Sequence, residues 1–309
     1  MSKVAVIGAG NVGATAAYCV AEKNIADVIM VDVVPGFPQS KALDFLHGSP
    51  LQGYSVDIVG TNDYAAIKDA QVVIHTAGIP RKPGMDRMDL LRTNVNIAKE
   101  AAQNIAKYAP EAIIIAVANP LDIIATVCLR ESGFNRERVL GMAGVLDSTR
   151  FRYFIAERLH VLPQDVQAMV LGGHGDSMVP LTRYASVAGI PLSDLLDADT
   201  IKELSDRTRV GGGEIVKYLK TGSAYYAPGA SSAQMALSVL QDEKRIIPAS
   251  AYLQGEYGYQ DLFLGVPVII GKQGIEKIIE LELTPEEKTA LDGSVDEVKG
   301  GLDQLASLG

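Results

Sequence analysis

Short apolar runs alternate with segments of helical periodicity over the first half of the chain. The apolar runs lie at residues 4–7, 28–31, 56–60, 71–76, 112–117 and 138–141, and helical patterns lie between them at about 14–22, 40–47, 90–108 and 123–132. Because strands that alternate with helices form βαβ units, this pattern predicts an α/β fold with a doubly wound parallel sheet of the Rossmann type over residues 1–144. Such a sheet binds ligands at the carboxyl ends of its strands.

The pattern changes beyond Gly144. We expect a long helix from Val145 to about Leu159, followed by a strand at 166–171, helices at 201–219 and 231–240, paired strands at 246–254 and 262–270, and an acidic helix from Thr284 without a chemical role. This mixture predicts a C-terminal α+β domain, residues 145–309, for substrate binding and oligomer contacts. Three glycines at 211–213 indicate a kink or a close backbone contact, since glycine is costly inside a helix.

A glycine-rich turn follows the first apolar run. It reads Gly8-Ala9-Gly10-Asn11-Val12-Gly13, and Asp32 ends the second run nineteen residues after Gly13. A strand before the turn, a helix after it, a second strand and a terminal acid together favour a dinucleotide site over a purely structural turn. Gly8 would permit the tight turn, Gly10 the approach of a pyrophosphate, and Gly13 the close packing of helix on strand. Residues 8–13 would then hold the phosphates at the helix N-terminus.

Asp32 indicates which dinucleotide binds. Its carboxylate can accept hydrogen bonds from both hydroxyls of an adenosine ribose, whereas its negative charge would repel a 2'-phosphate. The predicted cofactor is therefore NAD. The alternative is a solvated aspartate without a ligand.

Composition narrows the possible partners and location. The 309 residues, 48% of them hydrophobic, suffice for two cores. A net charge of -9 without a Lys/Arg-rich run argues against nucleic acid or membrane as a partner. Cys19 and Cys128 lie in apolar helical patterns, which indicates reduced thiols and neither disulfides nor a metal site. With no signal segment before Val4 and no run long enough to span a bilayer, we expect a cytoplasmic protein.

Polar residues follow two strands at the expected ligand-binding edge. The segment 77–89 carries Arg81, Lys82 and Arg87 among glycines and prolines, which is typical of a cationic lid but also of an ordinary surface loop. Asn119 follows the strand at 112–117 and precedes Pro120. It is a site candidate, although an asparagine at this place is often only a turn former.

His174 lies among Gly172, Gly173 and Gly175 and is our catalytic candidate among four histidines. His47 and His160 are expected at helix ends, and His75 in a strand with its hydrogen bonds satisfied. Upstream, Asp147 and Arg150 are three residues apart and share one face of a helix. The alternative for this pair is a capping aspartate with an ordinary ion pair.

Hydride transfer gives each of these residues a role. His174 would take the proton of a substrate hydroxyl, and Asp147 would orient the ring and stabilise its cation. Arg150 would bind the carboxylate next to the reacting carbon. One lid arginine would polarise the carbonyl oxygen and the other would bind a second carboxylate, which predicts a dicarboxylate substrate.

From Val4 to about Ile279 the chain resembles the lactate and malate dehydrogenases, most closely the lactate-dehydrogenase-like malate dehydrogenases of bacteria. The resemblance rests on five motifs in order, VAVIGAGNVG, AGIPRKPGMDR, VANPLD, GVLDSTRFR and LGGHGDSMVP. It implies that His174 is the proton acceptor, Asp147 its partner and Arg150 the clamp for the carboxylate at the reacting end. It also implies a homo-oligomer, dimer or tetramer.

The same resemblance assigns the remaining site residues. Arg87 corresponds to the arginine that polarises the carbonyl, and Arg81 stands where malate enzymes have arginine and lactate enzymes have glutamine. Asn119 is similar to the asparagine that contacts substrate and cofactor, while Asn94 and the backbone at Val117 correspond to further cofactor contacts. The expected function is NAD-dependent oxidation of (S)-malate to oxaloacetate, a reaction of the tricarboxylic acid cycle. Two alternatives are a lactate dehydrogenase and a non-catalytic dinucleotide sensor, against which the complete His174, Asp147 and Arg150 set argues.

Overall fold

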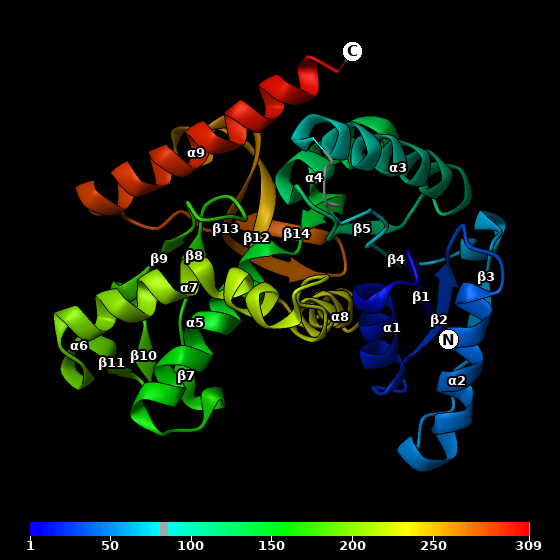
Figure 1. The fold of residues 1–309 in the computed structure, drawn as a ribbon, viewed down its shortest axis with the longest axis horizontal. Helices are drawn as coiled ribbons and strands as arrows, with labels where there is room; N and C mark the ends of the chain where they lie inside the picture. The colour runs from blue at the N-terminus through cyan, green and yellow to red at the C-terminus, as the bar shows by residue number, and fades with distance from the viewer. Residues whose placement is uncertain (81–85, 309) are drawn as a thin grey trace.

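A nine-stranded sheet runs through the protein in the computed structural model, which describes residues 1–80 and 86–308. Its strand order is β14-β13-β12-β6-β5-β4-β1-β2-β3 (Figure 1). Six strands from the first half of the chain are mutually parallel. They are β1 Ser2–Ile7, β2 Ala26–Val31, β3 Ile58–Thr61, β4 Val72–His75, β5 Ile113–Ala116 and β6 Val139–Gly141. The predicted doubly wound parallel sheet is confirmed.

Helices cover both faces of this parallel sheet. Those of the first half are α1 Asn11–Ala21, α2 Phe37–Gln52, α3 Arg87–Tyr108 and α4 Leu121–Ser132. In β1, Val4 and Val6 join the apolar core on the side of α1, whereas Ala5 and Ile7 join the core on the side of α3 and α4. Because both faces are buried, the strands read as continuous apolar runs rather than alternating ones.

Three antiparallel strands extend the sheet beyond β6. They are β12 Arg245–Gln254, β13 Gln260–Gly271 and β14 Gly274–Ile278, and β12 meets β6 where Ser250 pairs with Gly141. The pairing of β12 with β13 confirms the predicted paired strands. Helix α8, Tyr226–Leu240, packs against α1 so closely that a Cβ on Gly229 would lie 2.6 Å from Cβ of Thr15. The sheet thus takes strands from both sides of residue 144, and the domain boundary there stays a prediction.

The rest of the C-terminal half forms a smaller body with its own core around Phe151 and Leu204. It contains α5 Ala143–Leu159, α6 Leu192–Leu195, α7 Ala198–Leu219 and the short strands β7 Val166–Gln167, β8 Val170–Leu171, β9 Val179–Pro180, β10 Ser186–Val187 and β11 Ile190–Pro191. The single strand predicted at 166–171 is wrong, because the chain changes partner there. β7 pairs with β10, and β8 pairs with β9.

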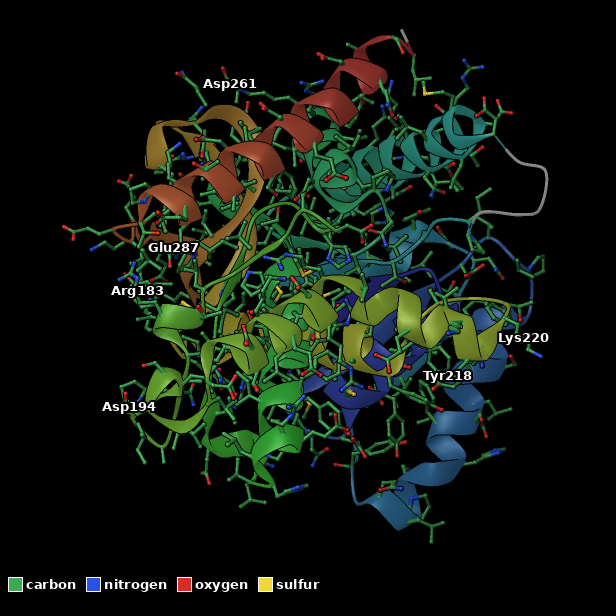
Figure 2. The ribbon with its side chains drawn as sticks, turned by 60° about the vertical axis from the view of Figure 1, so that its left-hand side comes forward. Arg183, Asp194, Tyr218, Lys220, Asp261 and Glu287 are labelled. Carbon is green, nitrogen blue, oxygen red and sulfur yellow. The ribbon has the colours of Figure 1, made fainter. Side chains whose placement is uncertain are left out.

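The last helix, α9 Pro285–Ala306, crosses the molecule beside α4 (Figure 1). Thr284 and Glu287 form a reciprocal capping box at its start. Glu287 also accepts from Arg183 at 3.0 Å, which ties α9 to the smaller body (Figure 2). In the described chain the remaining short helices are η1 Tyr64–Ile67, η2 Arg136–Arg138, η3 Pro163–Asp165, η4 Thr182–Tyr184 and η5 Glu256–Gly258. None of the helices in residues 1–80 and 86–308 has the length and apolar character needed to cross a bilayer.

The histidines outside the site differ from expectation in two of three cases. His160 caps the C-terminus of α5, as predicted. His47 lies inside α2, because that helix runs from Phe37 to Gln52 instead of covering only 40–47. His75 ends β4 fully buried, and within the described residues neither of its ring nitrogens has a hydrogen-bond partner. The expectation that its hydrogen bonds are satisfied is therefore wrong.

Candidate active site

The loop between β1 and α1 shows why its glycines stand where they do. Gly8 has a φ of +97°, in the region that glycine favours. A Cβ on Gly13 would lie 1.9 Å from the carbonyl oxygen of Gly8, so α1 can pack this close to β1 only without a side chain there. A Cβ on Gly10 would meet nothing within 4 Å. Gly10 therefore leaves open space beside the N-terminus of α1, where a pyrophosphate fits.

Asp32 directly follows β2 and its carboxylate is oriented by two backbone amides. The N–H of Ala9 donates to Oδ2 at 2.8 Å, and the N–H of Val34 donates to Oδ1 at 3.0 Å. A carboxylate offers about four lone-pair positions. Both oxygens can therefore still accept from ribose hydroxyls, and the residues present fit an adenosine dinucleotide.

His174, Asp147 and Arg150 form one connected group. Nδ1 of His174 lies 2.9 Å from Oδ2 of Asp147, and Nη1 of Arg150 donates to Oδ1 of the same carboxylate at 3.1 Å. The Asp147 side chain is 2% exposed. It lies inside α5, which begins at Ala143, so the alternative of a capping aspartate is wrong.

The surroundings of His174 favour its protonated form. Burial alone would lower the pKa of the ring, but the charge and hydrogen bond of Asp147, together with the charge of Asp122, outweigh burial and the opposing charge of Arg150. The net result is a raised pKa. A ring that can both accept and hold a proton suits acid–base work near neutral pH.

His174 and Arg150 line a cavity of about 250 Å³ between the smaller body and the edge of the sheet. Among its lining residues are Val12, Val117, Asn119, Arg150 and His174. The glycine turn, the end of β5, α5 and the histidine loop thus face one space. Gly212 and Gly213 of α7 belong to the wall as well. α7 continues through the three glycines, so the predicted kink is wrong. A Cβ on Gly212 would lie 3.5 Å from the Arg150 guanidinium, an ordinary van der Waals distance, so no close contact there requires glycine.

Asn94 is buried, and its side-chain amide bonds to backbone groups of two loops. Oδ1 accepts from the N–H of Ile79 at 2.8 Å, and Nδ2 donates to the carbonyl of Asn119 at 2.9 Å. Asn94 therefore fixes the exit of β5 relative to the segment after β4. Arg81 lies outside the described residues, and Arg87 is the first residue of α3.

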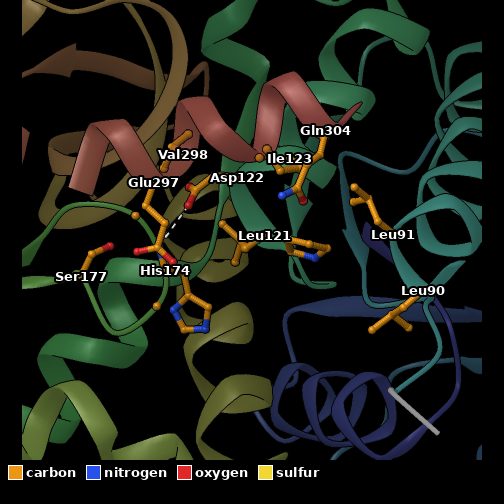
Figure 3. Close-up of a pocket in the computed structure, with 14 residues that line it drawn as sticks. Leu90, Leu91, Leu121, Asp122, Ile123, His174, Ser177, Glu297, Val298 and Gln304 are labelled. Atoms are coloured by element: carbon orange, nitrogen blue, oxygen red, sulfur yellow. Dashed lines mark hydrogen bonds between the residues drawn. The ribbon is translucent and has the colours of Figure 1, made fainter. Parts of the chain in front are cut away.

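Sequence reasoning missed several residues around His174. Arg209 of α7 lines the same cavity and donates to the carbonyl of Met178 at 3.1 Å. A second cavity of about 180 Å³ lies on the other side of the histidine loop (Figure 3). Asp122 from α4 and Glu297 and Gln304 from α9 line it. The final helix thus borders the site, which its amphipathic pattern did not indicate.

Comparison of the sequence with models of known protein families shows the family of this chain. Residues 2–141 match the model of the lactate/malate dehydrogenase NAD binding domain, and residues 144–308 match that of the lactate/malate dehydrogenase alpha/beta C-terminal domain. The chain belongs to the lactate/malate dehydrogenase family. This family membership confirms the resemblance drawn from the five motifs, and it confirms NAD as the cofactor.

Individual members of the family are similar along almost the whole chain. Malate dehydrogenase from Desulforudis audaxviator (strain MP104C) is 52% identical over 303 residues, 98% of either chain. The solved malate dehydrogenase from Salinibacter ruber has a TM-score of 0.95 and 50% identity, covering 99% of this chain and 98% of that one. Lactate dehydrogenase from Eimeria maxima, solved with NADH and oxamate, has a TM-score of 0.96 and 44% identity. The match covers 99% of this chain and 95% of that one.

Proposed function

We propose that this protein is an NAD-dependent malate dehydrogenase, which oxidises (S)-malate to oxaloacetate and catalyses the reverse reduction. The observation that carries the proposal is the shared cavity, where His174 and Arg150 face Asn119 and Val12 of the glycine turn. A proton acceptor, a carboxylate-binding cation and the edge of the cofactor site thus meet in one space. Relatives named malate dehydrogenase at about half identity support malate as the substrate.

His174 moves the proton in the proposed reaction. Because Nδ1 faces Asp147, Nε2 is the atom that takes the hydroxyl proton of malate while the carbinol carbon loses a hydride. Asp32 and the glycine turn would hold NAD+, which would supply the hydride acceptor. Asp147 stabilises the resulting imidazolium, which returns its proton to the oxygen in the reductive direction. The products are oxaloacetate, NADH and one proton held on His174.

The arginines account for the two carboxylates. Arg150 donates one N–H to Asp147, and its remaining donors can bind the carboxylate beside the reacting carbon. We assign Arg87 to the carbonyl oxygen and Arg81 to the second carboxylate. A monocarboxylate would leave the second guanidinium unpaired when the site closes, a loss of about 3–5 kcal/mol, or roughly 10²- to 10⁴-fold in rate.

The cofactor would lie from the glycine turn to the end of β5. We assign the phosphates to Gly8, Ala9, Gly10, Asn11, Val12 and Gly13, the adenosine ribose to Asp32, and the nicotinamide end to Val117 and Asn119. The direct contact expected from Asn94 stays a prediction. Its bonds to Ile79 and Asn119 support the site by fixing the backbone there.

A panel of 2-oxo acids, each with NADH and with NADPH, tests the proposal. We expect oxaloacetate with NADH to give the highest kcat/KM, at least 100-fold above pyruvate. Pyruvate as the better substrate would favour the lactate dehydrogenase alternative. For the sensor alternative, the wild type would bind NADH, seen as a change in its fluorescence, and yet reduce no 2-oxo acid. His174→Asn is the matched control for the proposed enzyme, since this variant should bind NADH but lose turnover.

Self-association is part of the proposal. Apolar side chains are exposed on two helices, with Leu43 of α2 54% exposed and Val210 of α7 54% exposed. Tyr218, 80% exposed, lies near the end of α7 (Figure 2). These apolar side chains are available for burial in the homo-oligomer, dimer or tetramer that we propose. Sedimentation velocity measures the oligomeric state, and a monomer at micromolar concentration would contradict the proposed self-association.

The cellular setting is proposed from the cysteines and the reaction. Cys19 and Cys128 are both free thiols, and burial raises the pKa of Cys128 to about 12, which makes it unreactive. Free thiols are typical of reducing compartments. We therefore propose a cytoplasmic enzyme that serves the malate step of the tricarboxylic acid cycle.

A further inference from the structure

One more buried carboxylate contacts the histidine loop besides Asp147. We propose that Asp122 is a positioning residue that holds the backbone of His174 and places a second negative charge beside its ring. This inference rests on the proton-transfer role proposed for His174. Asp122 lies within the VANPLD motif, yet its place in that motif does not show what it contacts.

Both carboxylate oxygens of Asp122 are engaged. Oδ2 accepts from the backbone N–H of His174 at 3.0 Å, and Oδ1 accepts from the hydroxyl of Ser250 at 2.6 Å. The residue is 6% exposed. Because both oxygens accept hydrogen bonds, the ionised carboxylate is the form that fits this arrangement. Burial raises the pKa of Asp122, and the bonds from Ser250 and His174 oppose that rise without cancelling it.

A four-residue segment reaches both sides of the histidine loop. Asn119, three residues after the end of β5, lines the cavity that contains Arg150. Asp122, the second residue of α4, lines the second cavity behind His174 (Figure 3). A dashed line in Figure 3 marks its bond to the loop. The short segment after β5 thus positions both Asn119, on the substrate side, and the backbone of His174.

The charged groups around the ring come from four helices and from the histidine loop itself. Asp147 and Arg150 lie on α5, Asp122 on α4, Glu297 on α9, Arg209 on α7 and Asp176 on the loop. Asp147 makes the larger contribution that favours the imidazolium, and Asp122 adds to it by charge alone. Removing the Asp122 charge should therefore lower the pKa of His174, even where the loop keeps its shape.

Ser294 offers a matched control that anchors the same loop without a charge. Its hydroxyl on α9 accepts from the N–H of Gly173 at 2.8 Å and lies 3.2 Å from the Ser177 hydroxyl. Removing it takes away one loop anchor beside His174 and leaves every charge in place. Glu297 is a second control, which removes a charge and no loop anchor. Its carboxylate lines the same cavity as Asp122 but is exposed to solvent.

The experiment compares the pH profiles of kcat/KM for malate in Asp122→Asn, Ser294→Ala and Glu297→Gln. Asparagine can still accept from the His174 amide, so Asp122→Asn keeps the anchor and loses the charge. We expect its acid-limb midpoint to fall by about half a pH unit or more. The alkaline limb of oxaloacetate reduction should move in the same direction. Ser294→Ala should lower kcat/KM without moving the acid-limb midpoint. Glu297→Gln should also leave the midpoint unchanged, because solvent screens the charge of Glu297.

An unmoved midpoint in Asp122→Asn would overturn the proposal, as would an equal shift in Ser294→Ala. Should Asp122→Asn fail to bind NADH, Asp122→Ser replaces it, since it removes the same charge and keeps a polar side chain at this place. A shift in the same direction is then expected, and none would count against Asp122. NMR titration of the His174 ring in the NAD+ complex gives the same pKa without turnover. A wild type that lacks any acid limb would instead contradict the proposed role of His174.

Discussion

Oδ2 of Asp147 lies 2.9 Å from Nδ1 of His174, while Oδ1 accepts from Nη1 of Arg150 at 3.1 Å. One buried carboxylate therefore fixes both the proton acceptor and the cation assigned to the substrate. Since α5 places Asp147 and Arg150 three residues apart, this geometry needs only the histidine loop to dock against one helix face. The relationship makes Asp147 the residue on which ring orientation and charge both depend.

Asp147→Asn should reduce turnover and move the pH profile. We expect kcat/KM for malate to fall by about 10²- to 10⁴-fold, because the amide can present its N–H₂ to Nδ1 and leave the proton on Nε2. Loss of the charge lowers the raised pKa of His174, so the acid limb of residual oxidation should shift to lower pH. Steady-state rates from about pH 5 to 9 check both effects. A wild-type midpoint in this variant would show that Asp147 does not act on the ring.

Gly13 and Gly10 should respond differently to alanine. Gly13→Ala places a Cβ against the Gly8 carbonyl, and we expect a loss of about 1–3 kcal/mol in the free energy of unfolding. Gly10→Ala meets open space and has a φ of -64°, so its stability should change by less than about 1 kcal/mol. Its NADH affinity should nevertheless fall at least about tenfold, because the methyl group occupies the approach of the pyrophosphate. Urea titration and NADH fluorescence measure the two effects, and a Gly10 variant with wild-type affinity would refute the assigned phosphate site.

Local patterns were sufficient for the parts of the site that lie close together in sequence. Gly8, Gly13 and Asp32 belong to one strand, turn, helix and strand unit, and Asp147 and Arg150 to one helix. Asp122 and Ser294 could not be predicted in this way. They reach the histidine loop from 52 and 121 residues away, through the packing of α4 and α9. The pairing of β12 with β6 at Ser250 and Gly141 is likewise a tertiary contact that neither strand's own pattern indicates.

Arg81→Gln should shift specificity toward pyruvate. The substitution removes the guanidinium assigned to the second carboxylate, so kcat/KM for oxaloacetate should fall by about 10²-fold or more while that for pyruvate rises. Lys82→Gln is the matched control, because it removes a neighbouring cation without an assigned role and should change either value less than about threefold. Both are measured from NADH oxidation under the same conditions. Undiminished oxaloacetate turnover in Arg81→Gln would show that another group selects the dicarboxylate.

His75 should make the fold sensitive to acid. Burial lowers its pKa from 6.5 to about 4, so the unfolded chain takes up the proton first as the pH falls. The stability that depends on a neutral His75 is complete above about pH 6.5 and is lost as the pH falls toward about 4. Between about pH 7 and 5 this amounts to roughly 2 kcal/mol in the free energy of unfolding.

In His75→Leu that share of the pH dependence should disappear, and urea unfolding of both proteins at equal concentration measures it. Because every other titrating group is common to the two, their difference isolates His75. Parallel stability curves for the two proteins would mean that the ring can be protonated inside the sheet at little cost.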